Sequence, residues 1–287
     1  MKKSRHSNYQ NFIESKYIKN KNYINLDEIR FDWIKKIIKS SDKIKSITDI
    51  GSNLGYMCLK FNEHFKTQSV GYEYEKPTFI KANKIKNKIK DVKYINKGLN
   101  ISNLSKIKKT DLLVHLNVLH HAGHMYDKKL IKSKNDWTKY SIKYLNLLTK
   151  KSKYLFFQTG NVNFNKNYFE NNETFNILPL ILKQAGWKII KIGNIDFSKK
   201  KIGYKSFDPR DINKIPIIEC KREKKTNKVI YTRGKKILLK YESGFLQRPL
   251  FWCVSNNYIK DARKLYYISW WLYHSINKLV IFKKKKI

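Results

Sequence analysis

Cysteine is scarce in this chain of 287 residues, which contains only Cys58, Cys220 and Cys253. The three lie far apart in the sequence, and none belongs to a Cys-x-x-Cys pair. Small secreted scaffolds depend on a dense set of disulfides, and closely spaced cysteine pairs mark zinc or redox sites. The count excludes a disulfide-built scaffold and predicts three free thiols in a reducing compartment.

Acidic residues and arginine are also in short supply. Lys and Arg number 62 against 22 Asp and Glu, for a formal net charge of +40, yet only seven of the 62 are arginine. A large positive excess is typical of proteins that bind nucleic acid. Arginine, however, is the residue best suited to bidentate contacts with phosphates and bases. Lys, Asn and Ile also have A/T-rich codons, so genome composition is a second explanation of the charge.

Long apolar segments are missing as well. The N-terminal residues carry positive charge without the apolar stretch of a signal peptide. The longest apolar stretch, 265–282, is interrupted by His274, Asn277 and Lys278, whereas a membrane span needs about 20 mostly apolar residues. Hydrophobic residues still make up 41% of the chain, which excludes a wholly disordered protein. We therefore expect a folded cytoplasmic protein.

The stretch 265–282 is rich in Trp and Tyr and is followed by a run of lysines. One interpretation is a C-terminal helix that packs on the rest of the protein or on a second subunit. The other is a peripheral contact with the inner face of a membrane, because aromatic and lysine side chains together favour an anionic lipid surface.

Short apolar segments alternate with amphipathic ones from residue 46 onward. The apolar segments are predicted strands, and those with apolar residues at helical spacing are predicted helices. Strands that alternate with helices indicate an α/β doubly wound, Rossmann-like parallel sheet of seven strands with helices on both faces. The predicted strands are 46–51, 69–75, 92–98, 111–121, 154–160, 187–193 and 248–254, and the predicted helices are 56–65, 77–89, 136–149 and 175–185.

The same pattern divides the chain into five segments. Residues 1–45 form a helical N-terminal extension, and 46–195 form the core. Residues 196–247 are rich in lysine but contain three short strand patterns, so we predict an inserted β-meander. Residues 248–257 supply the last core strand, and 258–287 form the aromatic helix and lysine tail.

The most informative block is ITDIGSNLGYMCLKF, in which Asp49 ends a predicted strand and Gly51 and Gly55 lie in the turn before a helix. Glycines in such a turn let the backbone approach a ligand closely, and doubly wound sheets bind ligands at the carboxyl ends of their strands. The dinucleotide fingerprint would need glycines where Asn53 and Tyr56 stand. A P-loop, which needs Gly-Lys-Ser/Thr, is also absent.

The spacing Asp-x-Gly-x-x-x-Gly resembles motif I of class I S-adenosylmethionine-dependent methyltransferases. The resemblance extends to VGYEYE, DLLVHLNVLHHAG and LKQAGWKIIKIG in the family's order, with RPLFWC after them. It implies the methyltransferase fold and S-adenosyl-L-methionine as cofactor, bound by the core at 46–195. Glu73 would accept hydrogen bonds from the two ribose hydroxyls. The implied cofactor-binding residues are Asp49, Gly51, Ser52, Asn53, Gly55, Glu73, Asn100 and Asn117.

The sequence departs from the family pattern in three places. The loop between His121 and Asp136 is longer than is typical of the family. An acidic residue often follows the third strand and contacts adenine, whereas this chain has Leu99 and Asn100 there; the Asn100 amide is the substitute we expect. The insertion at 196–247 lies outside the common core.

Methyl transfer from a sulfonium requires alignment of the acceptor, exclusion of water and, for a hydroxyl or protonated amine, a general base. His120 and His121 follow the fourth predicted strand and are the candidates for that base, the alternative being that they pack beneath the loop. His124 and Asp127 extend the pattern toward a metal site, but no helix holds their spacing, and no metal is expected. Gln158, Thr159 and Asn161 follow the fifth strand and are candidates for the acceptor pocket.

Three functions remain open from the sequence. The first is methyl transfer to a small molecule or glycan, and the second is methyl transfer to RNA, such as tRNA, with the basic insertion as a docking surface. The third is a binding module for RNA or a membrane that keeps the fold without turnover.

Overall fold

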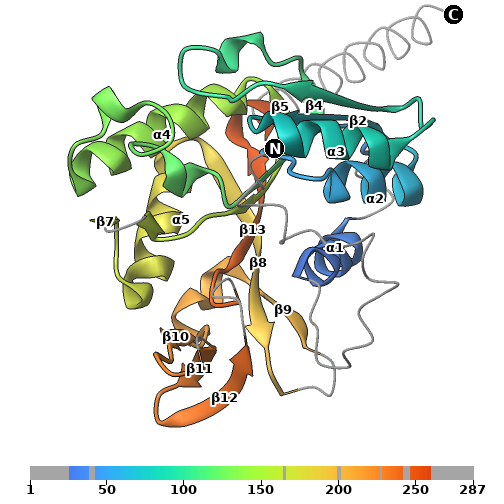
Figure 1. Cartoon of the computed structure of the whole chain (residues 1–287). Coiled ribbons are helices and arrows are strands. Elements are labelled where there is room, and N and C mark those ends of the chain that lie inside the picture. Colours follow the sequence, from blue (N-terminus) through green and yellow to red (C-terminus); the bar gives the residue numbers. More distant parts are fainter. Residues whose placement is uncertain are drawn as a thin grey trace, which may run out of the picture.

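The computed structural model describes residues 26–38, 43–163, 166–198, 202–226, 228–241 and 246–259. Most of the expected N-terminal extension and aromatic C-terminal helix lies outside the described residues. The described helices are α1 (Leu26–Ile37), α2 (Tyr56–Phe65), α3 (Lys76–Lys86), α4 (Lys134–Thr149) and α5 (Thr174–Gln184) (Figure 1). In the described part of the chain, no helix is long and apolar enough to cross a membrane.

The main sheet has the order β3-β2-β1-β4-β5-β13-β8-β9. Its strands are β1 (Ser46–Ile50), β2 (Gln68–Glu73), β3 (Val92–Asn96), β4 (Thr110–Leu116), β5 (Ser152–Gln158), β8 (Trp187–Asp196), β9 (Gly203–Phe207) and β13 (Leu250–Ser255). The strands β1 to β5 pair in parallel, whereas β13 pairs antiparallel with both β5 and β8. The doubly wound arrangement agrees with the prediction from the sequence. The strands β1 and β4 lie side by side in the middle of the parallel part, with β2 and β3 on one side of them and β5 on the other.

The prediction of seven strands was wrong by one. The additional strand is β9, which pairs antiparallel with β8 from Ile192 opposite Phe207 to Asp196 opposite Gly203. It comes from the segment 196–247, which we expected to lie entirely outside the sheet. Its sequence, GYKSF, is short and polar and only partly buried, as is usual for an edge strand, so it carries little of the apolar pattern that identifies core strands.

Two apolar layers cover the sheet. On one face, α4 and α5 bury a cluster that includes Trp137, Tyr144 and Trp187. On the other face, α1 and α2 bury a cluster that includes Phe31, Trp33 and Phe61. Figure 1 shows α4 and α5 on the left and α1, α2 and α3 on the right. The strands between them are buried on both sides, which explains their nearly continuous apolar sequences.

Local signals set the start of α4. Ser133 accepts a hydrogen bond from the backbone of Asp136, and the Asp136 carboxylate accepts one from the backbone of Ser133. This reciprocal pair is a capping box. The helix therefore begins at Lys134, two residues before the predicted start at Asp136.

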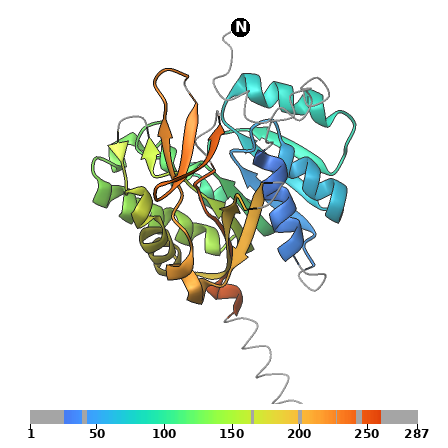
Figure 2. The ribbon, with the colours of Figure 1, turned by 90° about the horizontal axis from the view of Figure 1, so that it is seen from below.

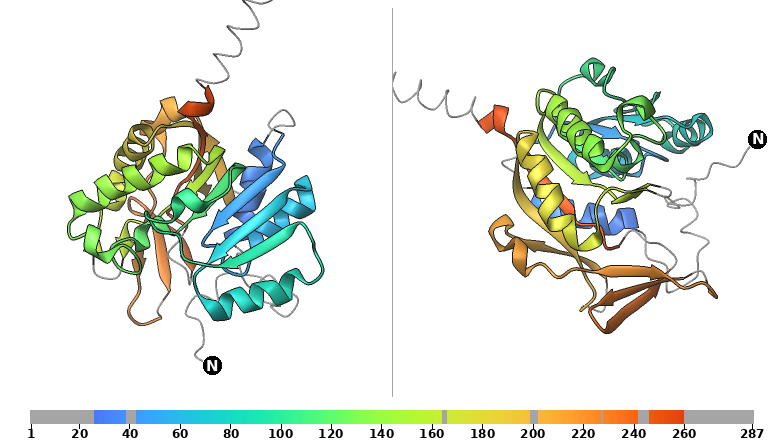
Figure 3. Two further views of the ribbon diagram at one scale, coloured as in Figure 1. Left: turned by 90° about the horizontal axis from the view of Figure 1, so that it is seen from above. Right: turned by 90° about the vertical axis from the view of Figure 1, so that its left-hand side faces the viewer.

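A second sheet of three antiparallel strands, the meander, follows β9. It consists of β10 (Glu219–Arg222), β11 (Val229–Arg233) and β12 (Lys236–Tyr241). A separate two-stranded ribbon, β6 (Val162–Asn163) and β7 (Lys166–Asn167), follows β5 in the chain. The backbone N–H of Leu246 donates to the Tyr231 hydroxyl at 3.4 Å and ties the meander to the segment before β13. Figure 2 shows the meander at one end of the sheet and residues 256–259 at the other, and Figure 3 shows it standing away from the helical layers.

Candidate functional site

The glycine loop, Gly51–Gly55, joins β1 to α2. Gly51, Asn53 and Gly55 all have positive φ, at 74°, 50° and 86°, in the left-handed region that glycine and asparagine tolerate best. The backbone N–H groups of Gly51 and Ser52 both donate to the carbonyl of Tyr72, at 2.9 and 3.0 Å. These bonds fix the loop against the end of β2.

Neighbouring side chains account for the two glycines. A Cβ at Gly51 would overlap the side chain of Val118, and one at Gly55 would overlap the buried ring of Tyr94. The loop therefore packs closely against the residues that follow β4 on one side and against β3 on the other.

Glu73 ends β2 beside the glycine loop, as the sequence predicts. One carboxylate oxygen accepts a hydrogen bond from the backbone N–H of Asn53 at 2.8 Å, and the other accepts one from Glu75 at 2.8 Å. The side chain is largely buried. Each carboxylate oxygen has two lone pairs and can accept more than one hydrogen bond.

Asp49 is buried under the loop on the face that α1 and α2 cover. Burial raises the pKa of its carboxyl well above the usual value, and the negative charges of Asp27 and Glu73 raise it further. Its Oδ2 lies 4.0 Å from the Sγ of Cys58, a residue whose side chain is fully buried in α2. Asp27 itself forms a buried ion pair with Arg30 at 2.8 Å, which offsets part of the negative charge beside Asp49.

Asn117 follows β4 and has a φ of 58°. Its Nδ2 donates to Gln158 Oε1 at 3.0 Å, and its Oδ1 accepts from Arg248 Nη1 at 2.8 Å. Gln158 Nε2 donates in turn to the Arg248 carbonyl at 2.7 Å and to the Tyr204 hydroxyl at 3.1 Å. We call these four residues, Asn117, Gln158, Tyr204 and Arg248, the amide network.

The sequence did not identify Arg248 or Tyr204 as site residues. Arg248 reaches the carboxyl ends of β4 and β5 because β13, which begins two residues later, runs antiparallel to both strands. An available signal was its residue type, since arginine is rare in this chain. Tyr204 lies on β9, the strand that the sequence did not predict.

His120 and His121 lie in a short 3₁₀ turn after β4, with ring centroids 4.0 Å apart. The backbone N–H of Gly160 donates to His120 Nδ1 at 3.3 Å. A neutral imidazole that accepts at Nδ1 carries its proton on Nε2, so in this geometry neither ring nitrogen of His120 is set up to take a proton from an acceptor. This leaves His121 as the better candidate for the general base.

The remaining predicted residues lie close by with side chains directed to protein groups. Asn161 Nδ2 donates to the Phe169 carbonyl at 3.0 Å, and the buried Thr159 hydroxyl contacts the Gly160 carbonyl at 3.4 Å. Asn100 Oδ1 accepts from the Ser102 hydroxyl at 2.8 Å and closes its own turn. Gln158 is fully buried within the amide network. Direct contact of these four with a ligand remains a prediction.

Asp127 has a structural role in the loop after β4. Its Oδ2 accepts hydrogen bonds from the backbone of Ile101 and from the Tyr140 hydroxyl. Within the described ranges, no group of three or more His, Cys, Asp or Glu side chains is placed to hold a metal ion.

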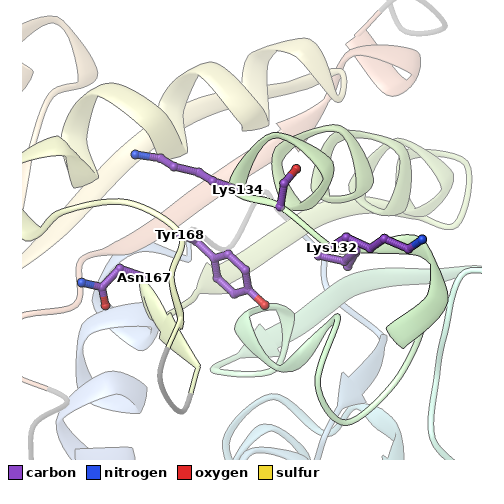
Figure 4. A pocket seen from close by; sticks show the side chains of 6 residues that line it. Lys132, Lys134, Asn167 and Tyr168 are labelled. Atoms are coloured by element: carbon purple, nitrogen blue, oxygen red, sulfur yellow. The ribbon is translucent and has the colours of Figure 1, made fainter.

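Two shallow cavities lie outside the glycine loop. One, of about 160 Å³, lies at the start of α4 and is lined by Lys132, Lys134, Asn167 and Tyr168 (Figure 4). Ser133 and Asp136 already cap that helix, and Lys134 pairs with Glu173 at 3.2 Å. The other, of about 210 Å³, lies between α1 and β9. Neither is placed to receive the cofactor that the motif implies.

No protein-family model and no curated protein matches this chain. Among solved structures, monomeric WbdD aligns with 79% of this chain and 41% of its own, at 12% identity and a TM-score of 0.42. WbdD is described as a bifunctional kinase-methyltransferase. StiE O-MT aligns over 80% of this chain and 74% of its own, at 10% identity and a TM-score of 0.45.

Magnesium protoporphyrin IX methyltransferase (ChlM) from Synechocystis PCC 6803, with bound SAM, aligns over 62% of this chain and 74% of its own. Its identity is 11% and its TM-score 0.41. This chain therefore spans less than half the length of the WbdD chain that it resembles.

Proposed function

We propose that this chain transfers the methyl group of S-adenosylmethionine to a small-molecule or glycan acceptor. One observation carries the proposal: the glycine loop after β1 and the Glu73 carboxylate after β2 are held together at the carboxyl edge of a doubly wound sheet. This is the edge at which such sheets bind nucleotide-like ligands. The residues that follow β4 pack against the same loop through Val118.

The residues present fit the cofactor. The carboxyl groups of Asp49 and Glu73 lie beside the loop, where they would suit a cationic sulfonium. Glu73 is placed beside the loop to accept hydrogen bonds from a vicinal diol. The Ser52 hydroxyl is buried beside Gly71, and no described residue hydrogen-bonds it. A buried hydroxyl without a partner is costly, so a ligand group over the loop would satisfy it.

The cofactor would supply an electrophilic methyl group whose leaving group is already activated. The chain's own residues then have three tasks. The amide network would form one wall of the acceptor site. Its hydrogen bonds hold Asn117 and the segment before β13 in fixed positions. His120 holds the Gly160 backbone through Nδ1, and His121 would take the proton of the methyl acceptor, a contribution of roughly 10²–10⁴-fold in rate.

Cofactor binding is tested by calorimetry with S-adenosylhomocysteine and S-adenosylmethionine. We expect both to bind, and we expect Glu73→Gln to weaken binding by roughly 10- to 100-fold, since hydrogen bonds to a charged group contribute about 1.5–3 kcal/mol. The matched control is Glu75→Gln. It removes the same charge at a position two residues from Glu73, where the carboxylate accepts a hydrogen bond from the Thr78 hydroxyl. Absence of binding at millimolar concentration would reject the enzyme and favour the non-catalytic binding module.

The acceptor class is tested by incubating the protein with labelled S-adenosylmethionine and separated small-molecule, saccharide, lipid and RNA fractions. We expect label in the small-molecule or saccharide fraction. Label in RNA alone would replace the proposed acceptor with RNA.

One observation favours the RNA alternative. The meander carries exposed lysines on β10, on β12 and between β10 and β11, among them Lys221, Lys225, Lys228, Lys236 and Lys240. A surface that binds a polyanion predicts a linear fall of log affinity with log salt, with a slope near −0.7 per phosphate contact for a single strand. A flat response in an RNA titration would remove this alternative.

A further inference from the structure

Two aromatic side chains hold the backbone on either side of the histidine pair, which lies in the 3₁₀ turn Leu119–His121. The Trp137 Nε1–H donates to the Leu119 carbonyl at 3.4 Å, and the Tyr168 hydroxyl donates to the Ala122 carbonyl at 2.7 Å. Leu119 precedes the two histidines, and Ala122 follows them. The pair is therefore bonded to an aromatic donor at both ends.

The two donors form one unit. The rings of Trp137 and Tyr168 are stacked, with centroids 4.6 Å apart and planes 9° from parallel. Both side chains are buried, and stacked aromatic rings attract each other beyond the effect of the area that they bury. Figure 4 shows Tyr168 beside the start of α4, the helix that carries Trp137. We call Trp137 and Tyr168 the aromatic clamp.

Tyr168 also holds the chain that follows β5. Its backbone N–H donates to the Asn161 carbonyl at 2.7 Å, and Asn161 Nδ2 donates to the Phe169 carbonyl at 3.0 Å. These bonds close the base of the ribbon of β6 and β7, and β6 contacts the 3₁₀ turn. Tyr168 therefore joins the two segments of chain that meet where the Gly160 N–H donates to His120 Nδ1.

The bond between Gly160 and His120 is sensitive to small movements. Its length of 3.3 Å is greater than is usual for an N–H donor, so a small displacement of either segment would break it. A buried carbonyl that loses its partner costs free energy, so the turn would move if the Tyr168 hydroxyl were removed. The orientation of the His120 ring, and of the His121 ring 4.0 Å from it, therefore depends on the clamp.

We propose that the aromatic clamp positions the histidine pair, so that His121 is held where it can take the proton of the methyl acceptor. Trp137 and Tyr168 are positioning residues, because they act through the backbone carbonyls on either side of the pair. Their role in the reaction rests on the proposed function, whereas their effect on the histidine rings does not.

The test compares Tyr168→Phe with Tyr94→Phe. Each variant loses one buried hydroxyl that donates to a loop carbonyl, that of Ala122 for Tyr168 and that of Gly55, at 3.2 Å, for Tyr94. Each keeps its ring, so both should fold. The histidine ring nitrogens of the full-length protein are followed by ¹⁵N NMR at about pH 8, above the usual histidine pKa of about 6.5. The signals lost in His120→Asn assign that residue.

In the native protein we expect His120 as the Nε2–H tautomer, with Nδ1 as the acceptor. Tyr168→Phe should give a mixture of both tautomers, and Tyr94→Phe should keep the native one. A purely structural contribution would lower the stability of both variants and change neither tautomer. An unchanged tautomer in Tyr168→Phe, or an equal change in Tyr94→Phe, would overturn the clamp.

Kinetics measure the role in the reaction, with the acceptor found by label transfer. At saturating S-adenosylmethionine, Tyr168→Phe should lower kcat roughly threefold to tenfold, the factor that one net hydrogen bond represents. The KM for the acceptor should stay within about twofold, because the clamp acts on the proton acceptor and not on binding. An unchanged kcat would overturn that role.

Cofactor binding to the native protein separates the two proposals. If S-adenosylhomocysteine fails to bind while Tyr168→Phe still changes the His120 tautomer, the methyltransferase proposal fails and the clamp stands. If the cofactor binds and the tautomer is unchanged, only the clamp fails.

Discussion

The glycine loop and the amide network lie at the same edge of the sheet, but the chain builds them in different ways. The bond that joins the loop to Glu73 spans 20 residues of sequence. The bonds of the amide network span 41, 46, 90 and 131 residues. The loop is therefore a local feature of one β-α-β unit, whereas the network exists only once β4, β5, β9 and β13 have assembled.

The two regions also differ in charge. Beside the loop, burial raises the pKa of Asp49, and the negative charges of Asp27 and Glu73 raise it further. The amide network, in contrast, includes the guanidinium of Arg248.

The largest effect is expected from a substitution that disrupts only the glycine loop. Gly55→Ala forces a side chain to a φ of 86° and into the ring of Tyr94, so we expect a loss of about 4 kcal/mol in unfolding free energy and no cofactor binding. Gly186 is the matched control, because its φ is 89° but the nearest atom to an added Cβ is 3.6 Å away. Urea unfolding should show a loss of only about 1–2 kcal/mol for Gly186→Ala. Equal losses would mean that the contact with Tyr94 is unimportant.

Damage to the acceptor side should leave the cofactor in place. With the acceptor identified by label transfer, His121→Asn should lower kcat by roughly 10²–10⁴-fold. His120→Asn keeps an acceptor for the Gly160 N–H and should cost less than tenfold. The affinity for S-adenosylhomocysteine should change less than threefold in both variants. A larger loss for His120→Asn would reverse the roles of the two histidines.

The parts of the site that form within one short stretch of chain are the parts that could be predicted from the sequence. The loop, Glu73 and the parallel core were predictable because strand, glycine turn and helix follow one another within one stretch of chain. Tyr204 was missed because β9 is a polar edge strand, and Arg248 because its place depends on an antiparallel strand far along the chain. Gln158 was predicted to bind the acceptor, but side-chain bonding to Arg248 and Tyr204 cannot be inferred from a sequence pattern.

His115 tests the stability of the acceptor side, since it is buried in β4 between Tyr144 and Phe157. Burial lowers its pKa from 6.5 to about 4. The unfolded chain binds the proton more readily, so this contribution to stability is complete above pH 6.5 and is lost as the pH falls toward 4. We expect a loss of about 3 kcal/mol across that range from this group. Urea unfolding of His115→Phe should lack this component, and the exposed His124→Phe should keep it.

A substitution at Gln158 should have the smallest effect on stability and should separate the amide network from the glycine loop. Gln158→Leu removes the amide that bonds to Asn117, Arg248 and Tyr204, at a cost of about 2 kcal/mol. Methyl transfer should fall at least tenfold, while calorimetry should show cofactor affinity unchanged within threefold. Asn146→Leu is the control, because Asn146 bonds to the Ala185 carbonyl at the opposite edge of the sheet. If it slowed methyl transfer equally, the effect would be one of general stability.

The pairing of β13 with β8 has a consequence for how such a protein can diversify. These strands are neighbours over six residue pairs, so the chain returns one strand spacing from β8, about 5 Å away. Between them the chain adds β9 to the edge of the main sheet and then builds the meander as a separate sheet. The meander can therefore vary without rethreading the parallel strands, and under the proposed function its exchange is the natural starting point for redirecting the same core to a different acceptor.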